Sequence, residues 1–211
     1  MSTKDHQSEP IESASETLQR IFDGHGSVLG SQMADESSRY DVLKKTDFPK
    51  PQRTRRIAVA NQKGGVGKTT STVNTAAALA NKGAQVLVID MDPQGNASTA
   101  LGVSHASGEP SVYDVIEGRS DLGDVITVCP DFPTLDVVPA SIDLSGAELE
   151  VADLPNRNTL LKEALDLYLR QSDKHYDYVF IDCPPSLGLL VINAMCAVTE
   201  MLIPIQAEYY A

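Results

Sequence analysis

The chain has 211 residues, of which 42% are hydrophobic, so it can form one domain of ordinary size with a substantial core. Its 17 basic and 29 acidic residues give a formal net charge of −12. Residues 1–56 hold 9 of the basic and 9 of the acidic residues, so residues 57–211 carry the whole negative charge. This balance argues against a general nucleic-acid surface on residues 57–211, because phosphate contacts need clustered lysine and arginine.

Cysteine and histidine usage gives little sign of a metal or redox site. The three cysteines form no C-x-x-C pair, and we interpret them as buried, reduced thiols of a cytosolic protein: Cys129, Cys183 and Cys196. The histidines are scattered, and we expect them at the surface: His6, His25, His105 and His175. The first residues lack the features of a signal peptide, and no apolar run approaches the ~18 residues of a membrane span. The composition therefore predicts no association with a membrane.

Residues 1–55 have the composition of a tail. They are rich in Ser, Glu, Asp, Lys and Gln, and they lead into a basic, proline-containing stretch at 48–56. One part, residues 11–23, has apolar side chains at helical spacing and is followed by a glycine. We therefore expect a disordered tail and linker with one short helix, which is either transient or a docking element for a partner.

From residue 56 to residue 211, predicted strands and helices alternate. The strands are expected at 57–61, 85–90, 135–139, 178–182 and 201–205, and the helices at 68–81, 111–117, 158–170 and 187–198. This alternation predicts an α/β domain with a mostly parallel, twisted sheet and helices on both faces. The last predicted strand is followed by no helix that would cover it, so we expect the domain to be truncated at its C-terminal end.

Residues 63–70 have the composition of a phosphate-binding loop between the first predicted strand and an alanine-rich predicted helix. Glycines let backbone N–H groups close around phosphate oxygens, Lys68 supplies a positive charge, and the hydroxyl of Thr69 suits Mg²⁺. The stretch departs from the ordinary G-x-x-x-x-G-K-[ST] pattern at Gln62, and it has a second lysine, Lys63, at its front. The candidate nucleotide-binding residues are Lys63, Gly64, Gly65, Val66, Gly67, Lys68, Thr69 and Thr70.

Two later strands are predicted to end in carboxylates, at the sheet edge where open α/β folds bind ligands. Asp182 follows the strand at 178–182, and its position suits a magnesium ligand that acts through water. Asp92 follows the strand at 85–90, and its position suits a group that orients the water attacking a γ-phosphate. Asp90, at the end of the same strand, is better interpreted as a support for the loop. The predicted metal residues are therefore Thr69 and Asp182.

Together these motifs resemble those of ParA-type (ParA/Soj) partition ATPases. Residues 61–70 look like the deviant Walker A box of that family, 90–98 resemble its A′ motif, and 179–188 resemble its Walker B and switch II segments. The resemblance covers residues 56–211 and leaves the tail out. It implies a deviant P-loop NTPase that binds ATP and Mg²⁺ and forms an ATP-dependent homodimer. It also implies that Lys63 reaches the phosphates bound by the other subunit, which makes Lys63 and Asp92 the candidate catalytic residues.

The resemblance implies partners as well. Full-length members bind DNA nonspecifically, and a ParB-type centromere-binding protein stimulates their otherwise weak ATP hydrolysis. The implied role is chromosome or plasmid partition in the cytoplasm, at the nucleoid. In this family the basic DNA-contact residues and part of the adenine pocket follow the position of Ala211. We therefore expect the 211-residue chain to bind ATP weakly and DNA not at all, even if the full-length protein binds both.

Three alternatives remain open on the sequence. A MinD-like, membrane-cycling ATPase of division-site placement shares the loop with two lysines, and it would carry an amphipathic C-terminal helix. An iron–sulfur reductase-like ATPase would need two thiolates per subunit at the dimer axis, yet the stretches around Cys129 and Cys183 are not glycine-rich. A regulatory protein could also bind nucleotide without turning it over.

Overall fold

The computed structural model describes residues 28–46 and 48–207, and the helix expected at 11–23 lies outside them. The chain divides into two units, one up to Phe48 and one from Pro49 onward.

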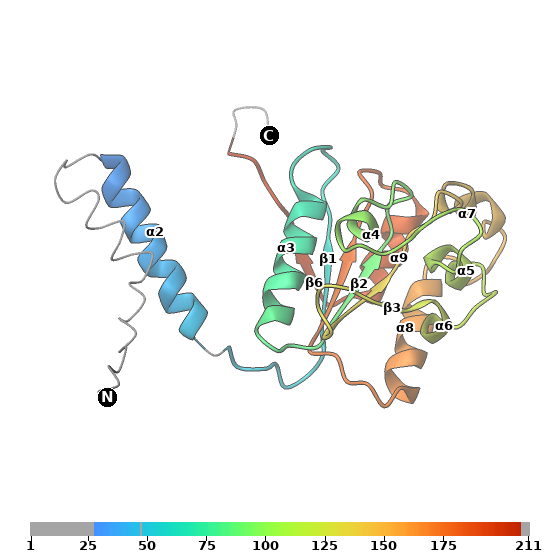
Figure 1. The fold of residues 1–211 in the computed structure, drawn as a ribbon. Helices are drawn as coiled ribbons and strands as arrows, with labels where there is room; N and C mark the ends of the chain where they lie inside the picture. Colours follow the sequence, from blue (N-terminus) through green and yellow to red (C-terminus); the bar gives the residue numbers. More distant parts are fainter. Residues whose placement is uncertain (1–27, 47, 208–211) are drawn as a thin grey trace, which may run out of the picture. The chain divides into compact units, whose positions relative to one another are not determined.

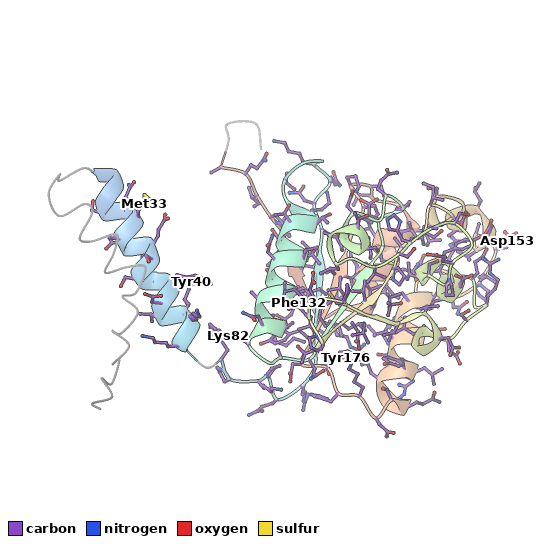
Figure 2. All side chains as sticks on the ribbon, in the orientation of Figure 1. Met33, Tyr40, Lys82, Phe132, Asp153 and Tyr176 are labelled. Atoms are coloured by element: carbon purple, nitrogen blue, oxygen red, sulfur yellow. The ribbon has the colours of Figure 1, made fainter. Side chains whose placement is uncertain are left out.

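In the N-terminal unit, an 18-residue helix, α2 (Val28–Lys45), occupies part of the stretch expected to be disordered. No proline or glycine interrupts residues 31–45, and Lys44 and Lys45 in the last turn complement the negative C-terminal end of the helix. The helix can therefore form from local hydrogen bonds, which a search for an apolar face does not detect. Met33 and Tyr40, labelled in Figure 2, expose 41% and 66% of their surface on this helix.

The second unit contains a six-stranded sheet in the order β3-β4-β2-β5-β1-β6. All neighbouring strands are parallel except β3 and β4, so the predicted mostly parallel α/β fold is confirmed. The strands are β1 (Arg55–Val59), β2 (Val86–Asp90), β3 (Thr127–Val128), β4 (Leu135–Val138), β5 (Tyr178–Asp182) and β6 (Glu200–Leu202).

The helices of this unit cover both faces of the sheet (Figure 1). They are α3 (Lys68–Asn81), α4 (Asn96–Ala100), α5 (Val112–Ile116), α6 (Leu122–Val125), α7 (Leu144–Glu150), α8 (Leu160–Gln171) and α9 (Leu189–Ala197). The four predicted helices are present as α3, α5, α8 and α9, with ends that differ by at most two residues from the predicted ones.

Alternate residues of the central strand β2 enter two different cores. Val86 and Val88 join a cluster with alanines of α3, whereas Leu87 and Ile89 join a larger cluster with side chains of α8 and α9. All five residues of β2 are buried. A strand covered on both faces needs an unbroken apolar run, and this is why the sequence of β2 does not alternate with polar residues.

Several short elements escaped prediction. The helices α4, α6 and α7 have only four to seven residues, too few for a helical period to stand out. The two-residue edge strand β3 exists because Thr127 and Val128 pair antiparallel with β4. The last strand is shorter than expected and ends at Leu202; Pro204, which has no N–H to donate to a ladder, follows closely.

The amino end of β4 is closed by a buried polar group. Asp136 accepts hydrogen bonds from the hydroxyl of Tyr176, labelled in Figure 2, and at 2.5 Å from the ammonium of Lys174. This cluster lies at the amino end of its strand, whereas the predicted site residues all follow the carboxyl ends of theirs.

Candidate functional site

The register of the sheet brings the three predicted motifs together. Strand β5 lies between β1 and β2, and Asp182 pairs with Val59 on one side and with Asp90 on the other. The loop after β1, the turn after β2 and the carboxylate at the end of β5 therefore meet at one edge of the sheet, where parallel α/β folds bind their ligands.

The loop between β1 and α3 has the backbone of an anion-binding turn. Gly65 and Gly67 have φ angles of 76° and 90°, in the left-handed region that favours glycine. Beyond the neighbouring residues, no atom lies within 4 Å of a Cβ built on Gly64, Gly65 or Gly67. Val66 is buried and anchors the loop, while Thr70 is exposed on the first turn of α3. The loop thus combines left-handed glycines with open space at its surface.

Lys68, the first residue of α3, lies inside this loop. Its side chain is buried, and its Nζ donates to the backbone carbonyl of Lys63 at 3.3 Å. The ammonium of Lys68 is therefore held against the loop backbone, at the N-terminus of α3. Both this charge and the helix dipole favour the binding of an anion at the loop.

The carboxylate of Asp182 is held by two threonines of α3. Thr69 Oγ1 donates to Asp182 Oδ2 at 2.7 Å, and Thr72 Oγ1 lies 3.0 Å from Asp182 Oδ1. The structure thus joins the two predicted metal residues, Thr69 and Asp182. Thr72 was not singled out from the sequence, although the i, i+3 spacing from Thr69 places the two threonines on the same face of α3.

Burial raises the pKa of Asp182 to about 6, and the nearby carboxylates of Asp90 and Asp92 add to the rise, while hydrogen bonds from Thr69 and Thr72 oppose it. Three carboxylates at one sheet edge repel one another, and a cation among them would relieve this repulsion. The electrostatics of the site therefore fit a divalent metal ion together with an anionic ligand.

Asp90 and Asp92 have different surroundings. The buried Asp90 accepts hydrogen bonds from the backbone N–H groups of Asp92 and Ser98 and from the Ser98 hydroxyl, so the interpretation of Asp90 as a loop support is confirmed. Asp92 uses Oδ1 to accept the N–H of Gln94 at 3.0 Å, and its carbonyl accepts the N–H of Gly95. Asp92 thus lies at the start of a tight turn, and Asp90 fixes this turn by accepting hydrogen bonds from the N–H groups of Asp92 and Ser98.

Two amides that sequence reasoning missed tie the loop to the segment after β6. Asn61 Oδ1 accepts the N–H of Lys63 at 3.0 Å, and Asn61 Nδ2 donates to the carbonyl of Pro204 at 2.9 Å. Gln206 Nε2 donates to the carbonyl of Gly65 at 3.2 Å. Asn61 could have been suspected from its place just before the glycines, whereas nothing in the sequence connects Gln206 with a loop 141 residues away.

The residues present fit a nucleotide with Mg²⁺. Thr69 and Asp182 offer a hydroxyl and a carboxylate oxygen 2.7 Å apart next to the open glycine loop. Magnesium takes few ligands from a protein of this kind and the rest from phosphate and water. Among the residues that the structure describes, no group of three or more His, Cys, Asp or Glu side chains is arranged to hold a metal ion.

The cysteines do not form a common site. Cys129 and Cys183 are buried as free thiols, as expected, whereas Cys196 on α9 is exposed, contrary to the prediction. Burial, with the Asp182 carboxylate beside it, raises the pKa of Cys183 to about 12, which disfavours a thiolate.

Within the ranges that the structure covers, no helix is both long and apolar enough to cross a membrane.

Comparisons with known proteins identify the family. A family profile described as an AAA domain matches residues 54–211. The sporulation initiation inhibitor protein Soj of Bacillus subtilis (strain 168) is 50% identical over 155 residues, which are 74% of this chain and 59% of Soj. The chromosome partitioning protein ParA of Caulobacter vibrioides (strain NA1000 / CB15N) is 46% identical over 155 residues, again 74% of this chain and 57% of the relative.

A solved structure supports the same fold. Cobyrinic acid a,c-diamide synthase from Mycobacterium smegmatis with bound ADP and magnesium matches with a TM-score of 0.68 and 40% identity, over 75% of this chain and 62% of that one. The chain thus spans less than two thirds of the length of each of these three proteins. The profile match over residues 54–211 shows that the chain belongs to the AAA domain family, and its sequence is similar to those of the ParA and Soj proteins.

Proposed function

We propose that the protein is an ATP-driven dimerisation switch that partitions chromosome or plasmid DNA. The observation that carries the proposal is the contact of Thr69 with Asp182 beside a glycine loop that holds a buried lysine. This arrangement offers a positive charge, backbone donors and oxygen ligands to one triphosphate with its metal ion.

Each residue of the loop has a role in binding. Lys68 would contact the β- and γ-phosphates, the backbone N–H groups of residues 64–70 would surround their oxygens, and Thr69 and Asp182 would hold the magnesium ion, Asp182 through water. Magnesium, when bound, supplies charge neutralisation for the triphosphate. ATP and Mg²⁺ are the expected ligands because the similar solved structure contains ADP and magnesium.

Asp92 orients the water that attacks the γ-phosphate. Its carboxylate lies in the turn after β2, close enough to Asp182 to influence the pKa of that group. A water held by a carboxylate keeps its lone pair directed at phosphorus, and this positioning is the main contribution that a protein makes to phosphoryl transfer. Hydrolysis by the protein alone is weak.

Lys63 makes nucleotide binding favour dimerisation. It stands at the front of the loop, half-buried, with its backbone N–H fixed by Asn61. We infer that its ammonium neutralises a phosphate of the nucleotide on the other subunit. ATP carries more charge at that point than ADP, so ATP favours the closed pair and hydrolysis releases it.

The biological role follows from the relatives. The Caulobacter relative is named as a chromosome partitioning protein, and we propose the same role here, at the nucleoid in the cytoplasm, with nonspecific DNA and a ParB-type protein as partners. The synthase name of the similar solved structure points to another reaction. We favour partition because the identity to Soj and ParA is higher, at 50% and 46%.

The test is light scattering of the purified protein with ATP and Mg²⁺, with ADP and Mg²⁺, and with ATP and a chelator. We expect a dimer only in the first condition, and a monomer in all three for Lys63→Ala. A wild-type protein that stays monomeric in saturating ATP and Mg²⁺ contradicts the switch. Co-sedimentation with DNA and with liposomes then separates partition from a membrane cycle, since retention on liposomes alone would favour the MinD-like alternative.

A further inference from the structure

The imidazole of His105 lies directly against the backbone of Gly95, in the turn that carries Asp92. A Cβ built on Gly95 would stand 2.5 Å from His105 Nδ1 and 2.6 Å from Cε1, distances that real Cβ atoms do not show. Gly95 also has a φ of 62°, in the left-handed region. Glycine is therefore required at position 95 both by its backbone angle and by the ring that covers it.

The same ring contacts the helix that follows the turn. His105 Nε2 lies 2.8 Å from Thr99 Oγ1, within hydrogen-bonding distance, and Thr99 belongs to α4. Gly95 is the N-cap residue of this five-residue helix, and the N–H of Thr99 donates to the Gly95 carbonyl. A single side chain thus contacts both ends of α4, although the sequence predicts only a surface position for His105.

The turn under His105 is the one that holds the candidate water-positioning group. The N–H of Gly95 donates to the carbonyl of Asp92 at 2.9 Å, and Gln94 donates to the Asp92 carboxylate at 3.0 Å. A shift of Gly95 therefore changes the hydrogen bonds that orient Asp92. Asp90 fixes the same segment through the N–H groups of Asp92 and Ser98, whereas His105 contacts Gly95 and Thr99.

His105 is itself held in place by a short closed loop. Glu109 accepts hydrogen bonds from the Ser104 hydroxyl at 2.5 Å and from the Ala106 N–H at 3.2 Å, one residue on each side of His105. Ser107 donates to Asp143 at 3.0 Å and so anchors this loop to the segment before α7. A side chain whose backbone is fixed on both sides can hold a neighbouring turn, whereas one on a free loop could not.

We propose that His105 is a positioning residue for Asp92: it fixes the Asp92–Gly95 turn by covering Gly95 and bonding to Thr99. This inference rests on the proposed function for its catalytic consequence, but the contact itself can be tested without ATP turnover. The imidazole touches neither the phosphate loop nor Lys68 in the contacts described above, so its effect is expected on the chemical step and not on nucleotide affinity.

The first test is a double-mutant cycle with Gly95→Ala and His105→Ala. In the wild-type background, the new methyl group displaces the imidazole and adds backbone strain; in the His105→Ala background only the strain remains. We expect the loss of Tm caused by Gly95→Ala to be smaller by about 2–4 °C when His105 is absent, which corresponds to a coupling of the usual size for residues in contact. Equal losses in both backgrounds would overturn the contact.

The second test measures the turn and the reaction. Amide hydrogen exchange of residues 92–99 should be on the order of 10-fold faster in His105→Ala, with exchange in α3 unchanged. With ATP, Mg²⁺ and the stimulating partner, kcat should fall on the order of 10-fold or more while KM and the affinity for a fluorescent ATP analogue stay constant. His105→Gln, whose amide can still reach Thr99, should restore most of both effects.

A matched control is His175→Ala, because the His175 side chain is 67% exposed and lies in the segment between α8 and β5. It should change neither exchange in the turn nor kcat. Unchanged exchange in His105→Ala, or unchanged kcat alongside faster exchange, would overturn the positioning role. If the wild-type protein does not hydrolyse ATP at all, the proposed function fails, and the cycle and the exchange rates still decide whether His105 fixes the turn.

Discussion

Thr69 and Asp182, 113 residues apart in the chain, are joined by a hydrogen bond of 2.7 Å from hydroxyl to carboxylate. The bond links the first turn of the helix after the phosphate loop to the end of the central strand β5. Asp182 is fully buried, and the carboxylates of Asp90 and Asp92 stand close enough to raise its pKa. The site thus carries an electrostatic cost in the protein without ligands, and this cost can be measured.

We expect Asp182→Asn to stabilise the nucleotide-free protein at pH 7. The Asn oxygen can still accept from Thr69, and its NH₂ group can donate to Thr72 while the Thr72 hydroxyl turns to the Lys68 carbonyl, 3.0 Å away. All partners stay satisfied and the buried charge is removed. The gain in the free energy of unfolding should be on the order of 1–3 kcal/mol, measured by urea denaturation.

The gain should depend on pH with a defined sign. The folded-state pKa of Asp182, about 6, lies above the ordinary value of 3.8, so ionisation disfavours the folded state. The penalty is absent below about pH 4, where the carboxyl group is protonated in both states, and grows until about pH 6. Asp182→Asn should therefore match the wild type near pH 4 and exceed it above pH 6. A constant difference across this range would contradict the shifted pKa. Asp182→Ala removes the acceptor of the Thr69 hydroxyl and leaves a cavity, so it should be less stable than Asp182→Asn at every pH.

The two lysines of the phosphate loop should differ in what they control. Lys68 is buried inside the loop, so Lys68→Ala should weaken binding of a fluorescent ATP analogue by on the order of 100-fold or more. Lys63→Ala should change this affinity by less than about 3-fold, because in the proposed dimer Lys63 neutralises a phosphate of the nucleotide on the other subunit. Lys82→Ala, at the opposite end of α3, is the matched control. Retained affinity in Lys68→Ala would show that the loop is wrongly assigned.

Asp92 should be needed for hydrolysis and not for binding. Asp92→Ala should keep ATP affinity and lower kcat by on the order of 100-fold or more. Asp92→Asn separates two roles, because its oxygen still accepts the N–H of Gln94 and so preserves the turn, while its charge is lost. If only Asp92→Ala is inactive, Asp92 acts by shaping the turn; if both variants are inactive, the carboxylate itself is required. Normal turnover in both would exclude a part for Asp92 in the reaction.

Much of the site could be predicted because its chemistry restricts residue type. Glycine adopts the left-handed angles of Gly65 and Gly67 at the least steric cost, and a carboxylate at the end of a strand offers the charged oxygen ligand that magnesium prefers. These restrictions appear in the sequence as fixed residues at fixed spacing. The strands of the sheet could be predicted for a similar reason. A strand that is buried on both faces has an unbroken apolar run in its sequence, as β2 does.

The rest depended on contacts between distant parts of the chain. Gln206 reaches Gly65 across 141 residues, and His105 covers Gly95 through a loop with no periodicity of its own. Neither residue type is required by its local sequence, since many side chains can occupy a loop. The helix α2 was missed for the opposite reason: it is a local structure, and its sequence lacks the apolar face on which the prediction of helices relied.

Asp90→Asn should have the opposite effect to Asp182→Asn, although both aspartates are buried neighbours on adjacent strands. The pKa of Asp90 is also raised by burial, but its hydrogen bonds, chiefly those from Ser98, oppose the rise. Its oxygens accept from backbone N–H groups, at 3.1 Å from Asp92 and 2.8 Å from Ser98, and an N–H group cannot reverse its role as a hydroxyl can. An Asn side chain must therefore turn its NH₂ group toward at least one donor. The two donors would repel each other, and a buried N–H would lose its acceptor, at a cost of about 1–3 kcal/mol.

Urea denaturation of the two single variants at pH 7 measures the contrast directly: we expect Asp90→Asn to lower the midpoint and Asp182→Asn to raise it. The same direction of change in both would show that removal of charge, and not the identity of the hydrogen-bond donors, decides stability at this edge of the sheet.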